Sequence, residues 1–230
     1  MKSCLLSTIP YRLLIQSLAA YPANNFVQFL LQLFGFDTTV QLINRYNIGT
    51  SKYWKRATVF WQVDINGKVR SGKIMKYDAQ TGRRIKRPFH HINWVHSVLK
   101  LPGFELTQCL FGEHLLNQHP DRTVAIVESE KTAIIASVYL PQLLWLACGS
   151  LTNLTVEKCN VLAGRPIVLF PDLNGYARWR EKAIELSGIA PVTLSKLLER
   201  KATANERLKG LDLADYLLRF NTKDFLELQC

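Results

Sequence analysis

The chain has 230 residues, 48% of them hydrophobic and 10% aromatic, which is enough for one large or two small domains with a sizeable core and excludes wholesale disorder. Its net charge of +11 lies almost wholly in residues 1–120, where 15 Lys and Arg face 5 Asp and Glu, whereas residues 121–230 hold 14 against 13. This asymmetry indicates a polyanionic partner for the first half, with nucleic acid the first choice. A basic surface that is merely solvated is the alternative.

The first predicted elements are helical. The apolar segment 24–34 predicts a buried helix that ends at Gly35. Asp37 or Thr38 would cap a second helix that ends near Tyr46.

The sequence predicts a cytoplasmic protein that does not enter the membrane. Pro10, Arg12 and Gln16 interrupt the first apolar stretch, so no signal peptide is expected. No uninterrupted run reaches the roughly 18 apolar residues of a transmembrane helix. The cysteines form no C-x-x-C pair, which argues against a zinc ribbon or a disulfide framework and favours a reducing compartment. They are Cys4, Cys109, Cys148, Cys159 and Cys230.

The next segment changes to a strand pattern. Residues 57–64 are rich in strand formers, the Asn-Gly pair at 66–67 is a strong hairpin signal, and 68–77 read as the return strand. A further turn at 81–82 leads into a third segment. The pattern predicts an antiparallel meander over residues 57–87.

The same region is the most basic part of the chain. Cations hold phosphates and exposed aromatic rings stack on unpaired bases, so the composition favours single-stranded nucleic acid. The interleaved aromatic residues are Tyr53, Trp54, Phe60, Trp61 and Tyr77. The candidate nucleic-acid-binding residues are Lys73, Lys76, Arg83, Arg84, Lys86 and Arg87. The alternative is a meander with its aromatic residues inward and a solvated basic edge; Phe60 and Trp61 are expected to be partly core.

From residue 123 the pattern alternates between strands and helices. Strands are predicted at 123–127, 143–147, 166–170 and 192–194, and helices at 130–139, 155–162, 175–186 and 213–220. This alternation predicts an α/β fold with a parallel, doubly wound sheet. Residues 94–100 and 108–117 are expected to form short helices. A boundary near 119–121 would divide the chain into a smaller basic α+β region, 1–119, and an α/β domain, 120–230.

Two of the predicted strands lead directly into an acid. Glu128 follows the run 124–127, and Asp172 follows the run 167–170. Because the carboxyl ends of parallel strands share one edge of a sheet, the two carboxylates are expected to lie close together. Paired carboxylates suit a hard divalent cation such as Mg²⁺. The alternative is that each acid caps the helix that follows it.

The second half resembles the TOPRIM module of bacterial primases, topoisomerases and small nucleases. A strand that ends in Glu128, a helix, and a strand followed by Asp172-Leu173-Asn174 match the family's glutamate and Asp-x-Asp motifs. The resemblance covers residues 122–218. It implies that Glu128 serves in metal binding and proton transfer and Asp172 in metal binding. The segment 211–217 resembles the later acidic segment of the primase branch, which implies Asp212 as a further ligand, although Asp212 also reads as a helix cap.

Asn174 stands where the family has its second aspartate. An amide oxygen can bind Mg²⁺ but brings no charge, so the implied site, with Asn174 as a ligand, is weaker than one with three acids. The basic meander more loosely resembles the N-terminal part of a primase polymerase region.

The whole chain therefore looks like a TOPRIM-bearing, primase-like protein of bacterial mobile elements. The resemblance implies Mg²⁺- or Mn²⁺-dependent nucleotidyl transfer in DNA replication, on single-stranded DNA or RNA. It also implies a helicase or a zinc-ribbon-bearing protein as a partner, because the sequence shows neither part. A TOPRIM nuclease and a non-catalytic single-strand-binding accessory protein are the alternative functions.

Overall fold

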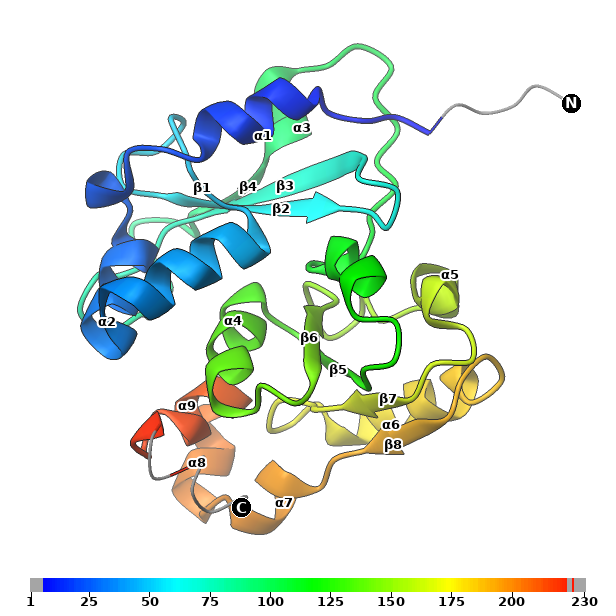
Figure 1. Ribbon diagram of the computed structural model, residues 1–230. Helices are drawn as coiled ribbons and strands as arrows, with labels where there is room; N and C mark the ends of the chain where they lie inside the picture. The colour runs from blue at the N-terminus through cyan, green and yellow to red at the C-terminus, as the bar shows by residue number, and fades with distance from the viewer. Residues whose placement is uncertain (1–5, 223–224, 226–230) are drawn as a thin grey trace, which may run out of the picture. The chain divides into compact units, whose positions relative to one another are not determined.

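The computed structural model describes residues 6–222 and residue 225. The chain folds into two compact units, Met1–Cys109 and Leu110–Cys230, and each unit contains its own sheet (Figure 1). The division of the chain at residues 119–120 stays a prediction.

The first unit is built on a four-stranded antiparallel sheet with the order β1-β2-β3-β4. Its strands are β1 (Ile48–Thr50), β2 (Thr58–Val63), β3 (Val69–Met75) and β4 (Ile92–Trp94). In the hairpin between β2 and β3, Gly67 has a φ of 76° and Asp64 Oδ1 accepts the backbone N–H groups of Asn66 and Lys68. The predicted antiparallel pairing of these two strands is confirmed.

Two details differ from the predicted meander. Its third segment forms only a single bridge, between Tyr77 and Arg84, and the strand that pairs with β3 is β4. The sequence pattern does not predict β1, because Gly49 reads as a stop signal. In the structure Gly49 is needed for a close approach, since a Cβ there would lie 2.3 Å from Ser17 Oγ.

Helices cover both faces of this sheet. The helices α1 (Tyr11–Ser17) and α3 (Val95–Leu99) lie on one face and α2 (Asn25–Tyr46) lies on the other (Figure 1). The 3-10 helix η1 (Tyr21–Ala23) precedes α2. Gly35, with a φ of 75° and a ψ of −177°, breaks the helical backbone of α2. The two helices predicted on either side of Gly35 are therefore confirmed as the two halves of a kinked helix, but Asp37 and Thr38 lie inside the second half and do not cap it.

Among the described residues, α2 is the one helix long and apolar enough to cross a membrane, judged by length and composition. The kink at Gly35 leaves two halves, each shorter than the roughly 20 residues that a spanning helix needs. The first half packs inside the unit, where the ring of Phe26 lies 5.3 Å from that of Phe60 and 5.1 Å from that of Tyr77. This half of α2 is part of the core.

Asn24 connects α2 to the sheet and is fully buried. Its Oδ1 accepts the backbone N–H groups of Phe26 and Val27 at the start of α2, and also the hydroxyl of Thr58 on β2. Its Nδ2 donates to the carbonyl of Gly49 on β1 at 3.1 Å. One side chain therefore satisfies buried polar groups on a helix and on two strands.

Substituting Asn24 with alanine is expected to lower the free energy of unfolding by about 3 kcal/mol, because a helix cap is lost and buried donors and acceptors lose their partners. Urea denaturation measures the change. Asn160→Ala, at an exposed asparagine, is the control and should unfold with the parent. A parent-like midpoint for Asn24→Ala would contradict this role.

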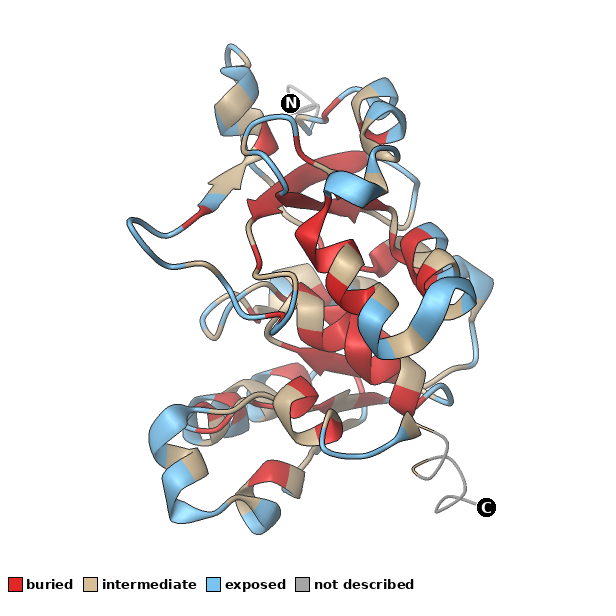
Figure 2. Ribbon diagram, turned by 90° about the vertical axis from the view of Figure 1, so that its left-hand side faces the viewer, coloured by how far each residue is buried: buried red, intermediate tan, exposed pale blue. Residues whose placement is uncertain are grey.

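The second unit is built on a parallel four-stranded sheet with the order β6-β5-β7-β8. Its strands are β5 (Val124–Val127), β6 (Leu144–Ala147), β7 (Ile167–Leu169) and β8 (Val192–Leu194). They agree with the four predicted strands, and the predicted parallel pairing is confirmed. All residues of β5 and β6 are buried; Figure 2 draws buried residues in red.

Helices precede, connect and follow these strands, and those between the strands are in the predicted order. They are η2 (Glu113–Gln118), α4 (Glu130–Tyr139), α5 (Val156–Cys159), η3 (Asn160–Leu162), α6 (Tyr176–Leu186), α7 (Leu197–Lys201), α8 (Ala204–Lys209) and α9 (Leu213–Leu217). The sequence pattern does not predict α7 and α8, which are short and have charged residues at half or more of their positions. The start of α8 carries a readable signal, since Thr203 and Glu206 form a capping box.

Cys109, Cys148 and Cys159 are buried and free. Burial raises the pKa of Cys148 and of Cys159 to about 12, so both thiols stay protonated at neutral pH. The expectation that Cys109 and Cys148 are small core residues is confirmed. Cys4 and Cys230 lie outside the described residues.

Candidate functional site

The two predicted strand-end acids lie on neighbouring strands. β5 and β7 pair in parallel, with Ile126 opposite Leu169, so Glu128 and Asp172 follow the same end of adjacent strands. The backbone N–H of Asp172 donates to the Glu128 carboxylate. The parallel register therefore brings the two residues together, as expected from the repeated pattern of an apolar run followed by an acid.

The ionised forms of the Glu128 and Asp172 carboxyl groups are both disfavoured in the folded chain. Burial raises the pKa of Glu128, and the charge of Asp212 raises it further. Burial raises the pKa of Asp172 well above its ordinary value, and the charges of Glu128 and Asp212 add to this effect. Asp172 Oδ1 is buried and has no hydrogen-bond partner in the structure. A positive charge placed beside this oxygen would stabilise the ionised carboxylate.

Lys131 forms ion pairs with two acids in this region. It lies in the first turn of α4, whose N-cap Ser129 accepts the N–H of Thr132. Its Nζ is 3.2 Å from Asp212 Oδ2 and 3.7 Å from Asp215 Oδ1. The charge of Lys131 also acts to lower the pKa of Asp172. We call the four acids of this region, Glu128, Asp172, Asp212 and Asp215, the acidic edge.

Asp212 is a helix cap, as one of the two readings of the sequence expects, and its role as a metal ligand stays a prediction. Its Oδ1 caps α9 by accepting the N–H of Asp215 at 2.8 Å, and the Asp215 carboxylate accepts the N–H of Asp212 in return. Its charge also raises the pKa of Glu128 and of Asp172, so it belongs to the acidic edge. Its Oδ2 pairs with Lys131.

Asn174 is exposed and has a left-handed backbone, with a φ of 73°. Its Nδ2 donates to the carbonyl of Arg207 at 3.0 Å, which leaves its Oδ1 as the atom for a metal. The backbone of the next residue, Gly175, lies close to the Glu128 carboxylate, since a Cβ there would be 3.0 Å from Glu128 Oε1. The sequence pattern does not predict this contact. The role of Asn174 as a ligand stays a prediction.

The donor set of the acidic edge fits Mg²⁺ in the way that this ion is usually held. Among the residues that the structure describes, no group of three or more His, Cys, Asp or Glu side chains is arranged to enclose a metal. Mg²⁺, however, is usually held by one or two carboxylates together with substrate phosphates and water. Glu128 and Asp172, with the unpartnered Asp172 Oδ1, match that requirement.

The predicted nucleic-acid-binding residues divide into two groups. Lys73 is buried in β3, where the residue is 8% exposed, and Lys76 is half-buried. The other four are exposed in the loop after the Asp78 turn and form the basic segment: Arg83, Arg84, Lys86 and Arg87. The basic segment is therefore the part of the set that is open to a partner.

The predicted aromatic residues also divide. Phe60 and Trp61 are core residues, as expected, and Tyr77 is a core residue as well. Tyr53 is 48% exposed and Trp54 is half-buried. Only these two of the five remain at the surface.

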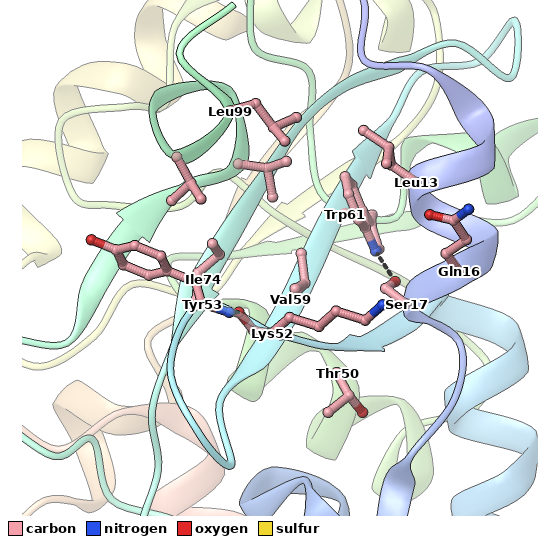
Figure 3. Close-up of a pocket in the computed structure, with 13 residues that line it drawn as sticks. Leu13, Gln16, Ser17, Thr50, Lys52, Tyr53, Val59, Trp61, Ile74 and Leu99 are labelled. Carbon is pink, nitrogen blue, oxygen red and sulfur yellow. Dashed lines mark hydrogen bonds between the residues drawn. The ribbon is translucent and has the colours of Figure 1, made fainter.

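The first unit also contains an apolar pocket of about 160 Å³ between α1, α3 and the sheet (Figure 3). Val59, Trp61 and Ile74 line it, and Trp61 Nε1 donates to Ser17 Oγ at 2.8 Å. Tyr53 also lines this pocket.

The fold of the chain is similar to that of solved primase domains. The RNA polymerase domain of Mycobacterium tuberculosis primase DnaG is 12% identical, with 96% of this chain and 83% of that chain covered and a TM-score of 0.59. The same domain in complex with double-stranded DNA is 13% identical, with 94% and 76% covered and a TM-score of 0.57. The zinc-binding and RNA polymerase domains of Aquifex aeolicus primase are 13% identical, with 84% and 48% covered and a TM-score of 0.50. The chain therefore has a primase-like fold.

The sequence itself matches a family defined without an activity. No curated protein matches it. The family model described as a domain of unknown function, DUF6371, matches residues 24–173. This match covers well over half of the chain and includes both Glu128 and Asp172. The chain belongs to the family DUF6371.

Proposed function

We propose that this chain is a cytoplasmic TOPRIM protein that joins nucleotides on a single-stranded template, as a primase does, in the replication of a mobile element. The observation that carries the proposal is the position of Glu128 and Asp172 after adjacent parallel strands. The primase-like fold and the basic first unit support it.

In this proposal Glu128 and Asp172 hold Mg²⁺ or Mn²⁺, with Asp212 and Asn174 as further ligands. The metal would neutralise the triphosphate and polarise its phosphoryl oxygens. Glu128, whose pKa is raised by burial, is suited to accept the proton of the attacking 3′-hydroxyl. Lys131 holds Asp212 in place from α4. The basic segment binds the template strand through its phosphates.

The partners follow from the same proposal. Single-stranded DNA or RNA is the template, and a helicase or a zinc-ribbon-bearing protein would deliver it. The Mycobacterium tuberculosis domain has been solved with double-stranded DNA, which supports a nucleic-acid partner for this fold.

Glu128→Gln and Asp172→Asn are each expected to reduce template-dependent incorporation of labelled nucleotides at least 100-fold with Mg²⁺ or Mn²⁺, because each removes a ligand or a proton acceptor. Gel electrophoresis of the products on single-stranded templates measures the change. Glu157→Gln, at an exposed acid in α5, is the matched control and should retain parent activity.

The products also separate the alternatives. Shortened strands in place of elongated ones, lost in the same two variants, would identify a TOPRIM nuclease. Tight binding without any metal-dependent product would identify a non-catalytic accessory protein. Parent-like elongation by Asp172→Asn would rule out the acidic edge as the catalytic site.

A further inference from the structure

Four aromatic rings form a contiguous cluster in the first unit. Tyr53 and Trp54 have ring centroids 4.8 Å apart, and Trp54 lies 5.2 Å from His91. His91 stacks on Phe89 at 4.3 Å with an angle of 30° between the ring planes, and Trp54 is 6.1 Å from Phe89. We call these four residues the aromatic cluster. It joins two loops that are more than thirty residues apart in the sequence.

Hydrogen bonds and core packing fix the position of the aromatic cluster. Ser51 Oγ accepts the N–H of Tyr53 at 3.1 Å, and the N–H of Ser51 donates to the carbonyl of Ala57 at 2.9 Å, which closes the first loop. His91 Nδ1 is 3.3 Å from the carbonyl of Ile85, which ties down the second loop. Trp54 packs against the buried core of the sheet. The rings are therefore pre-positioned, which lowers the entropy lost when a ligand binds.

The outer rings of the cluster remain open to solvent. Phe89 is 52% exposed and Tyr53 is 48% exposed, whereas His91 is buried. Phe89 and Tyr53 therefore present aromatic ring surface to solvent, where a flat, apolar group can stack on them.

The surroundings of the aromatic cluster are cationic. Lys52, Lys55 and Arg56 flank Tyr53 and Trp54, and all three are exposed. Lys86 and Arg87 precede Phe89 and are also exposed. Residues 51–57 and 83–92 contain no acid. The charged side chains of these two segments are therefore all cationic.

We propose that the aromatic cluster is a stacking platform for unpaired bases, with Phe89 and Tyr53 as the contacting rings and the flanking lysines and arginines on the phosphates. This proposal rests on the proposed function and adds to it a site that distinguishes single strands from duplexes. Bases in a duplex already stack on one another, so only an unpaired strand offers its faces to a protein ring. The charge selects a polyanion over an apolar protein segment.

Two contributions to binding follow, and salt separates them. The contribution of the cations falls as salt rises, because it depends on the release of counterions. The stacking contribution releases no counterions, so removing a ring should weaken binding equally at low and high salt. The basic segment and the aromatic cluster should therefore give different signatures in one titration series.

The test is fluorescence anisotropy with a labelled single-stranded oligonucleotide at several salt concentrations. Phe89→Ala and Tyr53→Ala should each raise the dissociation constant about 10-fold and leave its salt dependence unchanged. Phe89→Tyr should restore binding, because it restores a ring. Phe36→Ala is the matched control: Phe36 is 73% exposed on α2, outside the cluster, and its loss should have no effect.

An abasic oligonucleotide of the same length separates stacking from a structural effect. It offers phosphates without bases, so the parent and Phe89→Ala should bind it equally well. An equal loss on the abasic strand, a parent-like dissociation constant for both alanine variants, or equal competition by a duplex would each overturn the stacking platform while leaving nucleic-acid binding in place. If the parent itself binds no single strand, both the proposed function and this inference fail.

Discussion

Replacing Arg83, Arg84, Lys86 and Arg87 together with alanine is expected to weaken binding to single-stranded nucleic acid by on the order of 100-fold at 0.1 M salt. Each phosphate neutralised on a single strand contributes about 0.7 to the slope of log affinity against log salt, so the slope should fall by roughly 3. All four side chains are exposed, and the fold should survive their loss. Fluorescence anisotropy across a salt series measures both quantities.

The control for this variant carries the same change in charge elsewhere. Arg178, Arg180, Lys201 and Lys209 are four exposed cations of the second unit. Replacing them with alanine should have a much smaller effect on the affinity and the slope if the basic segment holds the strand. Equal losses in the two quadruple variants would mean that net charge, and not this surface, governs binding.

Asp172→Asn is expected to raise the melting temperature at neutral pH and to abolish any stabilisation by Mg²⁺ or Mn²⁺. Burial and the neighbouring charges of Glu128 and Asp212 raise the pKa of Asp172, so its ionised form destabilises the folded state. Removing that charge should add on the order of 1 kcal/mol, which is roughly 2–4 °C in a chain of this size. In the parent the cation should supply a comparable gain.

The effect has a defined dependence on pH. Because the folded pKa lies above the unfolded value of about 3.9, the folded chain holds the proton more tightly between these two values, and the parent loses stability as pH rises through that window. The advantage of Asp172→Asn should therefore vanish below about pH 4 and be complete above the folded pKa. Thermal melts from pH 3 to pH 8, with and without the cation, test it. A pH-independent difference would exclude the charge as the cause.

Much of the fold can be predicted from local patterns. The four parallel strands are apolar runs between helical segments, and the hairpin at Asn66 and Gly67 is a local turn signal. Glu128 and Asp172 can be predicted as neighbours because parallel pairing puts strand ends at one edge. These features depend only on residues close together in the sequence and on a general rule of sheets.

Features that depend on distant contacts could not be predicted. β1 requires Gly49 to approach Ser17, and Lys131 finds its acids more than eighty residues further along. Phe89 carries no pattern of its own and belongs to a cluster only because His91 and Trp54 lie beside it. Lys73 reads as a surface cation in the sequence, but β3 is buried along its whole length.

The ion pair between Lys131 and Asp212 has a consequence for the order in which the molecule is made. α4 is synthesised some eighty residues before α9, yet α9 packs on α4 and supplies the partners of Lys131. While the chain emerges from the ribosome, the second unit can form its sheet. Its acidic edge stays incomplete until the segment after residue 211 has also emerged. A nascent chain that has not yet reached α9 would carry Lys131 without Asp212 and Asp215, so these two ion pairs form only after α9 has been synthesised.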